Sequence, residues 1–244
     1  MSKTCIIVPC YNEATRLETG AFNNYLQETK DVSLCFVDDG STDSTVELIT
    51  KLQQTFPEKV YLKRLETNQG KASAVREGML EMDKNHDFDY LGYLDADLAT
   101  DLESMDKIIR FAEAHPAYDY LMGARISRLG ASIYRNRIRH YFGRIFATMA
   151  SSMLDLSVYD TQCGAKLMKN EIVQELFRKP FISRWLFDVE LLFRYKKYTA
   201  YFDKPFAVYE YPLNRWMEMG HTRIKPKDFV FVPFELLRIA RKYK

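Results

Sequence analysis

The chain has few cysteines, no long apolar run and little net charge. Its four cysteines form no CxxC pair and no metal-ligand spacing, so we expect neither a cysteine metal site nor a redox motif. No window approaches the roughly 18 consecutive apolar residues of a membrane-spanning helix. The formal net charge is only +2, which does not indicate a nucleic-acid-binding protein. Cys5 and Cys35 lie in apolar runs and indicate buried thiols in a reducing compartment.

The composition is that of a folded domain. Of the 244 residues 47% are hydrophobic and 28% charged, which excludes a disordered or low-complexity chain. The N-terminal residues enter an apolar strand directly and resemble no signal peptide. We therefore expect one domain that meets a membrane, if at all, from the surface.

Short apolar runs alternate with helical patterns over the first 125 residues. This alternation predicts a mostly parallel sheet with helices on both faces, an α/β fold. The predicted strands are 5–8, 34–37, 60–65, 90–94 and 118–122, followed by a short strand at 165–168. The predicted helices are 17–29, 43–54, 71–84, 102–115, one from 170, and 187–198.

Acidic residues follow two of these strands, at the sheet edge where ligands of such folds bind. Asp38 and Asp39 follow the second strand, and Asp95 and Asp97 follow the fourth. Aspartates after strands are often only turn formers. Two clusters at one edge favour a binding site, and carboxylates two residues apart suit Mg²⁺ or Mn²⁺.

Six motifs in order identify a family resemblance. They are VPCYNE at 8–13, VDDGSTD at 37–43, NQGK at 68–71, DADLAT at 95–100, DTQCGAKL at 160–167 and RWLFDVELL at 184–192. The first four resemble the family 2 glycosyltransferases with the GT-A fold. The last two resemble the branch of dolichyl-phosphate β-glucosyltransferases and polyprenyl-phosphate glycosyltransferases. The resemblance covers roughly residues 4 to 225.

This resemblance implies an inverting, metal-dependent transfer of a hexose, glucose first, from a UDP-sugar to a polyprenyl or dolichyl phosphate. The alternative acceptor is a glycan hydroxyl in cell-surface polysaccharide synthesis. The metal ligands would be Asp95 and Asp97, with Asp97 as the main ligand. The donor would be bound by Pro9, Tyr11, Glu13, Asp38, Asp39, Lys71, Asp95 and Arg223. Lys71 would equally suit a solvated first turn of a helix.

The acceptor side is less determined. Arg125, Arg137 and Arg139 are candidates to bind a lipid phosphate, since guanidinium groups suit phosphate oxygens; a solvated basic helix face is the alternative. Asp188 lies where hydroxyl-transferring relatives carry a catalytic base. It would also suit the start of a helix, where a carboxylate complements the dipole.

The chain is expected to divide within one domain, 1–244. Residues 1–125 would bind the nucleotide-sugar and 126–225 the acceptor, while 226–244 form an amphipathic basic tail. That tail suits either an interfacial helix on an anionic membrane or a helix packed on the domain. We expect a protein of the cytoplasm, peripheral on the cytoplasmic face of a membrane, with no nucleic-acid partner.

Overall fold

The computed structural model describes residues 2–134, 137–219 and 228–243. The N-terminal part alternates strands and helices. Its elements are β1 (Thr4–Cys10), α1 (Thr19–Glu28), β2 (Val32–Asp38), α2 (Thr45–Thr55), β3 (Val60–Arg64), α3 (Lys71–Asn85), β4 (Tyr90–Leu94), α4 (Leu102–Ala114) and β5 (Tyr120–Ala124). The C-terminal part is richer in helix. Its elements are β6 (Ser132–Tyr134), α5 (Arg137–Leu154), β7 (Ala165–Lys169), the 3₁₀ turn η1 (Asn170–Ile172), α6 (Val173–Phe177), α7 (Phe187–Tyr201), β8 (Val208–Pro212), β9 (Arg215–Met217) and α8 (Asp228–Tyr243).

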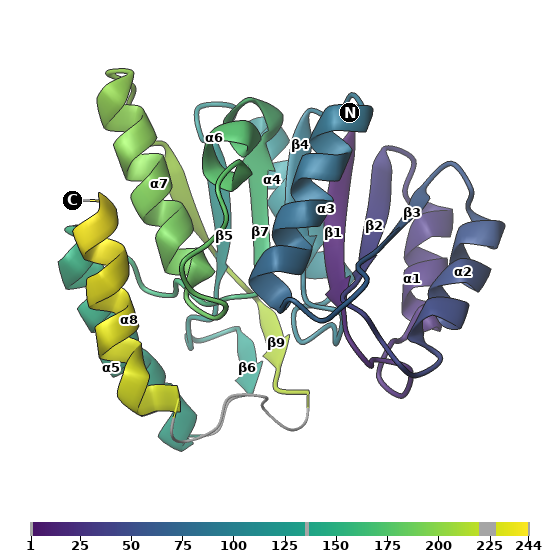
Figure 1. Cartoon of the computed structure of the whole chain (residues 1–244), viewed down its shortest axis with the longest axis horizontal. Helices are drawn as coiled ribbons and strands as arrows, with labels where there is room; N and C mark the ends of the chain where they lie inside the picture. The colour runs from purple at the N-terminus through teal and green to yellow at the C-terminus, as the bar shows by residue number, and fades with distance from the viewer. Residues whose placement is uncertain (1, 135–136, 220–227, 244) are drawn as a thin grey trace.

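A seven-stranded sheet organises the molecule, with the strand order β3-β2-β1-β4-β7-β5-β8 (Figure 1). All neighbours pair in parallel except β7, which runs antiparallel between β4 and β5. The mostly parallel α/β sheet is thus confirmed. A separate pair, β6 with β9, lies beyond the carboxyl ends of the parallel strands (Figure 1).

Two apolar layers cover the sheet because side chains alternate across each strand. Cys5 and Ile7 of β1 pack against α3, α6 and α7, while Ile6 and Val8 pack against α1, α2 and α4. Helix α3 lies especially close to the sheet: a Cβ at Gly78 would come within 2.7 Å of the Ile7 and Val37 side chains. This close approach brings the first turn of α3 to the carboxyl edge.

The predicted elements of the first 125 residues are confirmed, with shifts of at most two residues at their ends. Strands β6, β8 and β9 escaped prediction because each is short and only partly buried. The arginine-rich stretch after β6 forms α5, and the C-terminal tail forms α8. In the described part of the chain, no helix is both long and apolar enough to span a membrane.

Helix α8 packs on α5 and α7 through Leu236, Ile239 and Ala240. Its other side exposes Phe231, Phe234 and Leu237. The tail is therefore a helix held on the domain that also presents an apolar outer face.

Candidate active site

The loop after β1 is tied to the loop after β2. Asn12 has a positive φ of 51°, and its side-chain oxygen accepts a hydrogen bond from Thr42 N at 2.8 Å. In return, Asn12 N donates to Ser41 Oγ at 2.9 Å. This exchange holds Pro9 and Tyr11 beside Asp38 at the carboxyl edge. The predicted donor-binding residues of the two loops are thus brought together.

Glu13 lies in the same loop and is nearly buried. Its carboxylate pairs with Arg16 Nη2 at 2.6 Å, and its backbone N–H donates to Thr45 Oγ1 at 2.8 Å. Arg16, which sequence reasoning did not single out, adds a positive charge here. Glu13 therefore positions this arginine in addition to its predicted place beside the donor.

Asp39 fastens the loop that precedes α3. Its two carboxylate oxygens accept from Gln69 N at 2.7 Å and Gly70 N at 2.8 Å. Burial raises the pKa of Asp39, and the two backbone donors act in the opposite direction. Gly70 has a φ of 92°, a backbone conformation that favours glycine. Asp39 thereby fixes the approach to Lys71, and its predicted role in binding the donor stays a prediction.

The acidic pair after β4 is shaped by a tight turn. Leu98 has a positive φ of 52°, and the Asp97 carboxylate accepts a hydrogen bond from Ala99 N at 3.1 Å. Burial, followed by the negative charge of Asp95, raises the pKa of Asp97. Ala99 N–H, Lys71 and Arg16 oppose that rise. Two carboxylates held this close favour a cation between or beside them.

Lys71 is the cation nearest to this pair. As the first residue of α3, it places Nζ 2.5 Å from Asp95 Oδ1. Burial lowers the pKa of Lys71, but Asp95 and Asp188 more than offset this, so that the net pKa is raised and the ammonium stays charged. The side chain is partly accessible rather than fully solvated. Lys71 thus faces the acidic pair from the first turn of α3, and its contact to a donor stays a prediction.

Gly164 packs against the second carboxylate oxygen of Asp95, the one that does not contact Lys71. A Cβ on Gly164 would lie only 1.9 Å from Asp95 Oδ2, so that the carboxylate rests directly on the glycine backbone. Gly164 O also accepts from Asp95 N at 3.2 Å. The DTQCG segment thus forms a wall of the acidic site. The sequence signal was this glycine within a family motif, but its role required the tertiary contact.

Asp188 is buried in an ion pair beneath the site. Lys166 Nζ lies 2.7 Å from Asp188 Oδ1, and both side chains are almost fully buried. Tyr93 Oη donates to the same oxygen at 2.5 Å, and Lys166 also donates to Cys163 O at 2.5 Å. Sequence reasoning missed Lys166 and Tyr93. A lysine inside an apolar strand was the only signal, because such a charge needs a buried partner.

These charges suit a divalent cation held with phosphate oxygens. Asp95 and Asp97 supply hard oxygen ligands, and the glycine contact leaves the Asp95 carboxylate in a shaped cradle. Among the described residues, no group of three or more His, Cys, Asp or Glu side chains gathers in a metal-binding arrangement. The residues therefore fit a Mg²⁺ or Mn²⁺ ion that takes its other ligands from a substrate and water.

Arg125 occupies a buried pair rather than an open patch. Its Nε and Nη2 donate to the two oxygens of Asp160 at 2.6 and 2.8 Å. The central carbon of the Arg125 guanidinium, Cζ, lies over the Trp216 ring, 5.2 Å from the ring centre. Glu210 accepts from the backbone N–H groups of Tyr159 and Asp160, which fixes this loop. Arg125 thus anchors the DTQCG segment, and its contact to an acceptor phosphate stays a prediction.

The other predicted arginines are placed only in part. Arg137 and Arg139 belong to the first turn of α5, and their side-chain positions lie outside what the structure describes. Arg223 lies outside the described residues altogether. Arg184, for which the sequence suggested no role, lies against Gly70: a Cβ there would be 3.4 Å from Arg184 Cδ. Its charge acts on Asp39, which makes it a candidate donor-side residue.

The mixed sheet, the paired loops and the acidic turn after β4 are those of a GT-A fold. A solved structure of glucosyl-3-phosphoglycerate synthase from Mycobacterium tuberculosis in complex with UDP has a TM-score of 0.68 to this chain. The two are 16% identical, over 98% of this chain and 80% of that one. Another structure of that protein, with Mn²⁺, UDP-glucose and glycerol 3-phosphate, also has a TM-score of 0.68, at 14% identity over 99% and 80% of the two chains.

The model of the family "Glycosyl transferase family 2" matches residues 5–177, and the chain belongs to this family. It is a glycosyltransferase. Dolichyl-phosphate beta-glucosyltransferase of Mus musculus is 30% identical, over 98% of this chain and 77% of the relative. The protein of that name from Dictyostelium discoideum is 28% identical, over 98% and 74%. The predicted family and the resemblance to this branch are confirmed.

Proposed function

We propose that the protein transfers a hexose, with glucose as the first choice, from a UDP-sugar to the phosphate of a polyprenyl or dolichyl lipid. The configuration at the anomeric carbon of the sugar is inverted in the transfer, and the reaction depends on Mg²⁺ or Mn²⁺. The names of the relatives support the sugar and the acceptor. The complexes of the structural neighbour with UDP and Mn²⁺ support the donor and the ion. The observation that carries the proposal is the meeting of Asp95, Asp97 and Lys71 at the carboxyl edge.

The chain's own residues would bind the donor from three sides. The end of β1 and the segment after it, with Pro9, Tyr11 and Glu13, and the end of β2 and the residue after it, with Asp38 and Asp39, would hold the base and ribose. Lys71 would neutralise diphosphate charge from the start of α3, where the helix dipole also favours an anion. Asp95 and Asp97 would hold the divalent ion, which when bound stabilises negative charge on the departing diphosphate. The acceptor oxygen attacks the anomeric carbon while the bond to the diphosphate breaks, and UDP leaves.

The partners of Asp188 support a phosphate acceptor. A hydroxyl acceptor must lose a proton, for which a positioned base contributes about 10²–10⁴-fold. Asp188 is held between Lys166 and Tyr93 and is almost fully buried, which disfavours that role. A phosphate monoester has a second pKa of about 6 and is already a nucleophile at neutral pH. It needs positioning and charge balance rather than a base.

The proposed place of action is the cytoplasmic face of a membrane. All four cysteines are buried thiols outside any disulfide, which supports a reducing compartment. The lipid acceptor supports the membrane.

The test is transfer of radiolabelled glucose from UDP-glucose into an organic-extractable lipid, with purified protein, Mg²⁺ and a polyprenyl phosphate. EDTA and the Asp97→Asn variant are the controls. Labelled lipid that disappears in both controls is the expected result. Metal-dependent release of UDP without labelled lipid would contradict the proposed acceptor. No turnover with a panel of UDP- and GDP-sugars would contradict the donor as well.

A second arm tests the acceptor chemistry directly. The double variant Asp188→Asn with Lys166→Met removes both buried charges and keeps an oxygen for the Tyr93 hydroxyl. We expect it to fold and to retain transfer to polyprenyl phosphate within about tenfold, since no base is removed. A loss of about 10²–10⁴-fold in kcat at unchanged stability would assign Asp188 as a base and favour a hydroxyl acceptor.

A further inference from the structure

Exposed apolar side chains gather at one end of the molecule. Helices α5 and α8 begin at the same end of the molecule as β6 and β9, the end to which the carboxyl ends of β1 and β4 point (Figure 1). On these elements, just after β9 and on the turn before α7, large apolar side chains face outward. They are Tyr134, Tyr141, Ile145, Trp185, Met217, Met219, Phe231, Phe234 and Leu237, here called the apolar rim.

Helix α8 shows how the rim is built. Its inward face holds Leu236 and Ile239 in the core, whereas Phe231 and Phe234 are 62% and 67% exposed. The two phenylalanines are three residues apart and share one face of the helix. Leu236 and Ile239 already attach α8 to the domain, so that the outward phenylalanines are left for a partner.

The charge around the rim favours an anionic partner surface. The chain has no acidic residue between Asp119 and Asp155, a stretch that includes all of α5. The second half of α8 exposes Arg238, Arg241 and Lys242. Aromatic and aliphatic residues that lie beside basic residues at a helix surface are typical of binding to anionic lipid headgroups.

We infer that the apolar rim is a bilayer-docking surface, with Phe231 and Phe234 inserted among the lipids and the basic residues of α8 at the headgroups. The inference deepens the proposed function, because a polyprenyl phosphate would reach the acidic site from the same end of the molecule. It commits to a lipid bilayer rather than to a second copy of the chain, since the basic flank would repel its own copy.

Docking on a bilayer would affect the donor-binding side of the site through the contacts that α8 makes with the segment before α7. Ser183 Oγ donates to Glu235 of α8 at 2.6 Å and accepts from Leu186 N at 3.0 Å, at the start of α7. Arg184 follows Ser183 directly and lies against Gly70. At the far end of α8, Tyr243 donates to Glu190 at 2.7 Å. A helix held at the membrane would thus also hold the segment that carries Arg184.

The test measures vesicle binding with neither nucleotide nor acceptor present. Sucrose-loaded vesicles of phosphatidylcholine with phosphatidylglycerol are sedimented with the parent protein and with a Phe231→Ser, Phe234→Ser variant. We expect binding to fall about tenfold for each phenylalanine removed. The matched control is Tyr201→Ser with Phe202→Ser, which removes exposed aromatics from the opposite end of α7. It should bind vesicles as the parent does.

A third variant tests the basic flank: Arg238→Gln with Arg241→Gln and Lys242→Gln. It should lose binding to the anionic vesicles by about fivefold per charge while binding to pure phosphatidylcholine is unchanged. Thermal unfolding and calorimetric binding of UDP verify that each variant is folded and retains its donor site. These two readouts separate failure of docking from failure of the proposed function.

Three outcomes would overturn the inference. The parent protein does not bind the vesicles, or the Phe231, Phe234 variant binds as the parent does, or the Tyr201, Phe202 control loses as much. Sedimentation velocity without lipid adds a further one. If the phenylalanine substitutions dissociate a dimer and leave vesicle binding intact, the rim joins two copies of the chain instead.

Discussion

At the scale of single residues, the site is a chain of alternating charges. Asp97 and Asp95 face Lys71, which is influenced in turn by Asp188, the partner of Lys166. The three carboxylates and two ammonium groups together carry one net negative charge, which one further positive charge would balance. Each member restrains its neighbour, so that removing only one charge of a pair is expected to disturb the partner that remains.

Gly164→Ala is expected to disable the site without removing any functional group. The new Cβ would lie 1.9 Å from Asp95 Oδ2, so the carboxylate must turn away from Lys71 or β7 must shift. A displacement of about 1 Å at reacting groups costs on the order of 10²-fold in rate. The measurement is kcat/KM for the donor.

Gly20→Ala serves as the control for that substitution. Nothing lies within 4 Å of a Cβ at Gly20, in the first turn of α1. Activity should be unchanged, and stability should rise by about 0.5–1 kcal/mol because alanine is the better helix former. If Gly164→Ala were as active as Gly20→Ala, the contact of Gly164 with Asp95 would have no functional weight.

Asp160→Asn is expected to destabilise the protein in a pH-dependent manner. Burial would raise the pKa of Asp160, but Arg125 outweighs this and holds that pKa well below its usual range. The aspartate therefore stabilises the fold at neutral pH, and this stabilisation falls away as pH drops below its unfolded value of about 4. Removing one partner of a buried pair costs about 3–5 kcal/mol.

Urea unfolding at pH 7 and at pH 3 measures this effect. The gap in unfolding free energy between parent and Asp160→Asn should be large at pH 7 and smaller at pH 3, where the parent has begun to lose its advantage. A gap that is equal at the two values would show that the charge of Asp160 is not the cause.

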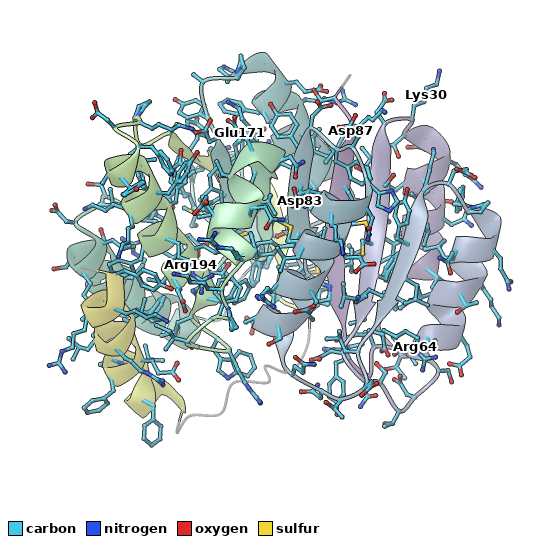
Figure 2. All side chains as sticks on the ribbon, turned by 45° about the horizontal axis from the view of Figure 1, so that its top comes forward. Lys30, Arg64, Asp83, Asp87, Glu171 and Arg194 are labelled. Carbon is cyan, nitrogen blue, oxygen red and sulfur yellow. The ribbon has the colours of Figure 1, made fainter. Side chains whose placement is uncertain are left out.

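At the scale of elements, α8 connects the outer surface to the donor side. Arg194 of α7, labelled in Figure 2, connects this helix to α6 and α8. It donates to Leu176 O, Lys179 O and Pro180 O and to Glu190, and it also contacts Tyr243. The segment before α7 is thus held by backbone contacts on one side and by Glu235 on the other.

Glu235→Ala is expected to loosen this segment. Loss of the Ser183 hydrogen bond should lower stability by about 1 kcal/mol. It should also raise KM for the donor more than it lowers kcat, because Arg184 lies beside Gly70 rather than at the sugar. Hydrogen exchange of residues 178–190 should be faster. Glu28→Ala, at an exposed position of α1, is the control and should change none of these quantities.

At the scale of the whole molecule, burial of the four thiols reports on global opening. All four cysteines are buried, and burial raises the pKa of Cys35 to about 12. A thiol with so high a pKa is almost entirely protonated at pH 8 and reacts slowly, since the thiolate is the nucleophile. We therefore expect Ellman's reagent at pH 8 to react at the rate of unfolding.

The control is a Lys30→Cys variant, at an exposed position on the periphery of the molecule (Figure 2). The introduced thiol of this variant should react with Ellman's reagent at once. The four buried thiols should react when urea is raised above the unfolding midpoint. Fast reaction of the parent in the absence of urea would mean that one layer of the core opens well below the global free energy of unfolding.

The sequence by itself determined the alternation of strands and helices, the mostly parallel sheet and the acidic carboxyl edge. These follow from local periodicity and from the rule that parallel strands end at one edge. The bounds of β4 and the start of α3 were predicted to the residue. Asp95 directly follows the apolar strand, and Gly70 directly precedes the helix.

Only the tertiary structure decided which groups pair. Lys166 with Asp188, Arg125 with Asp160 and Gly164 with Asp95 are 22, 35 and 69 positions apart in the chain, so no local pattern could join them. The antiparallel direction of β7 and the two faces of α8 were decided in the same way. Local patterns show which side of an element is apolar, whereas packing of distant segments decides what each side meets.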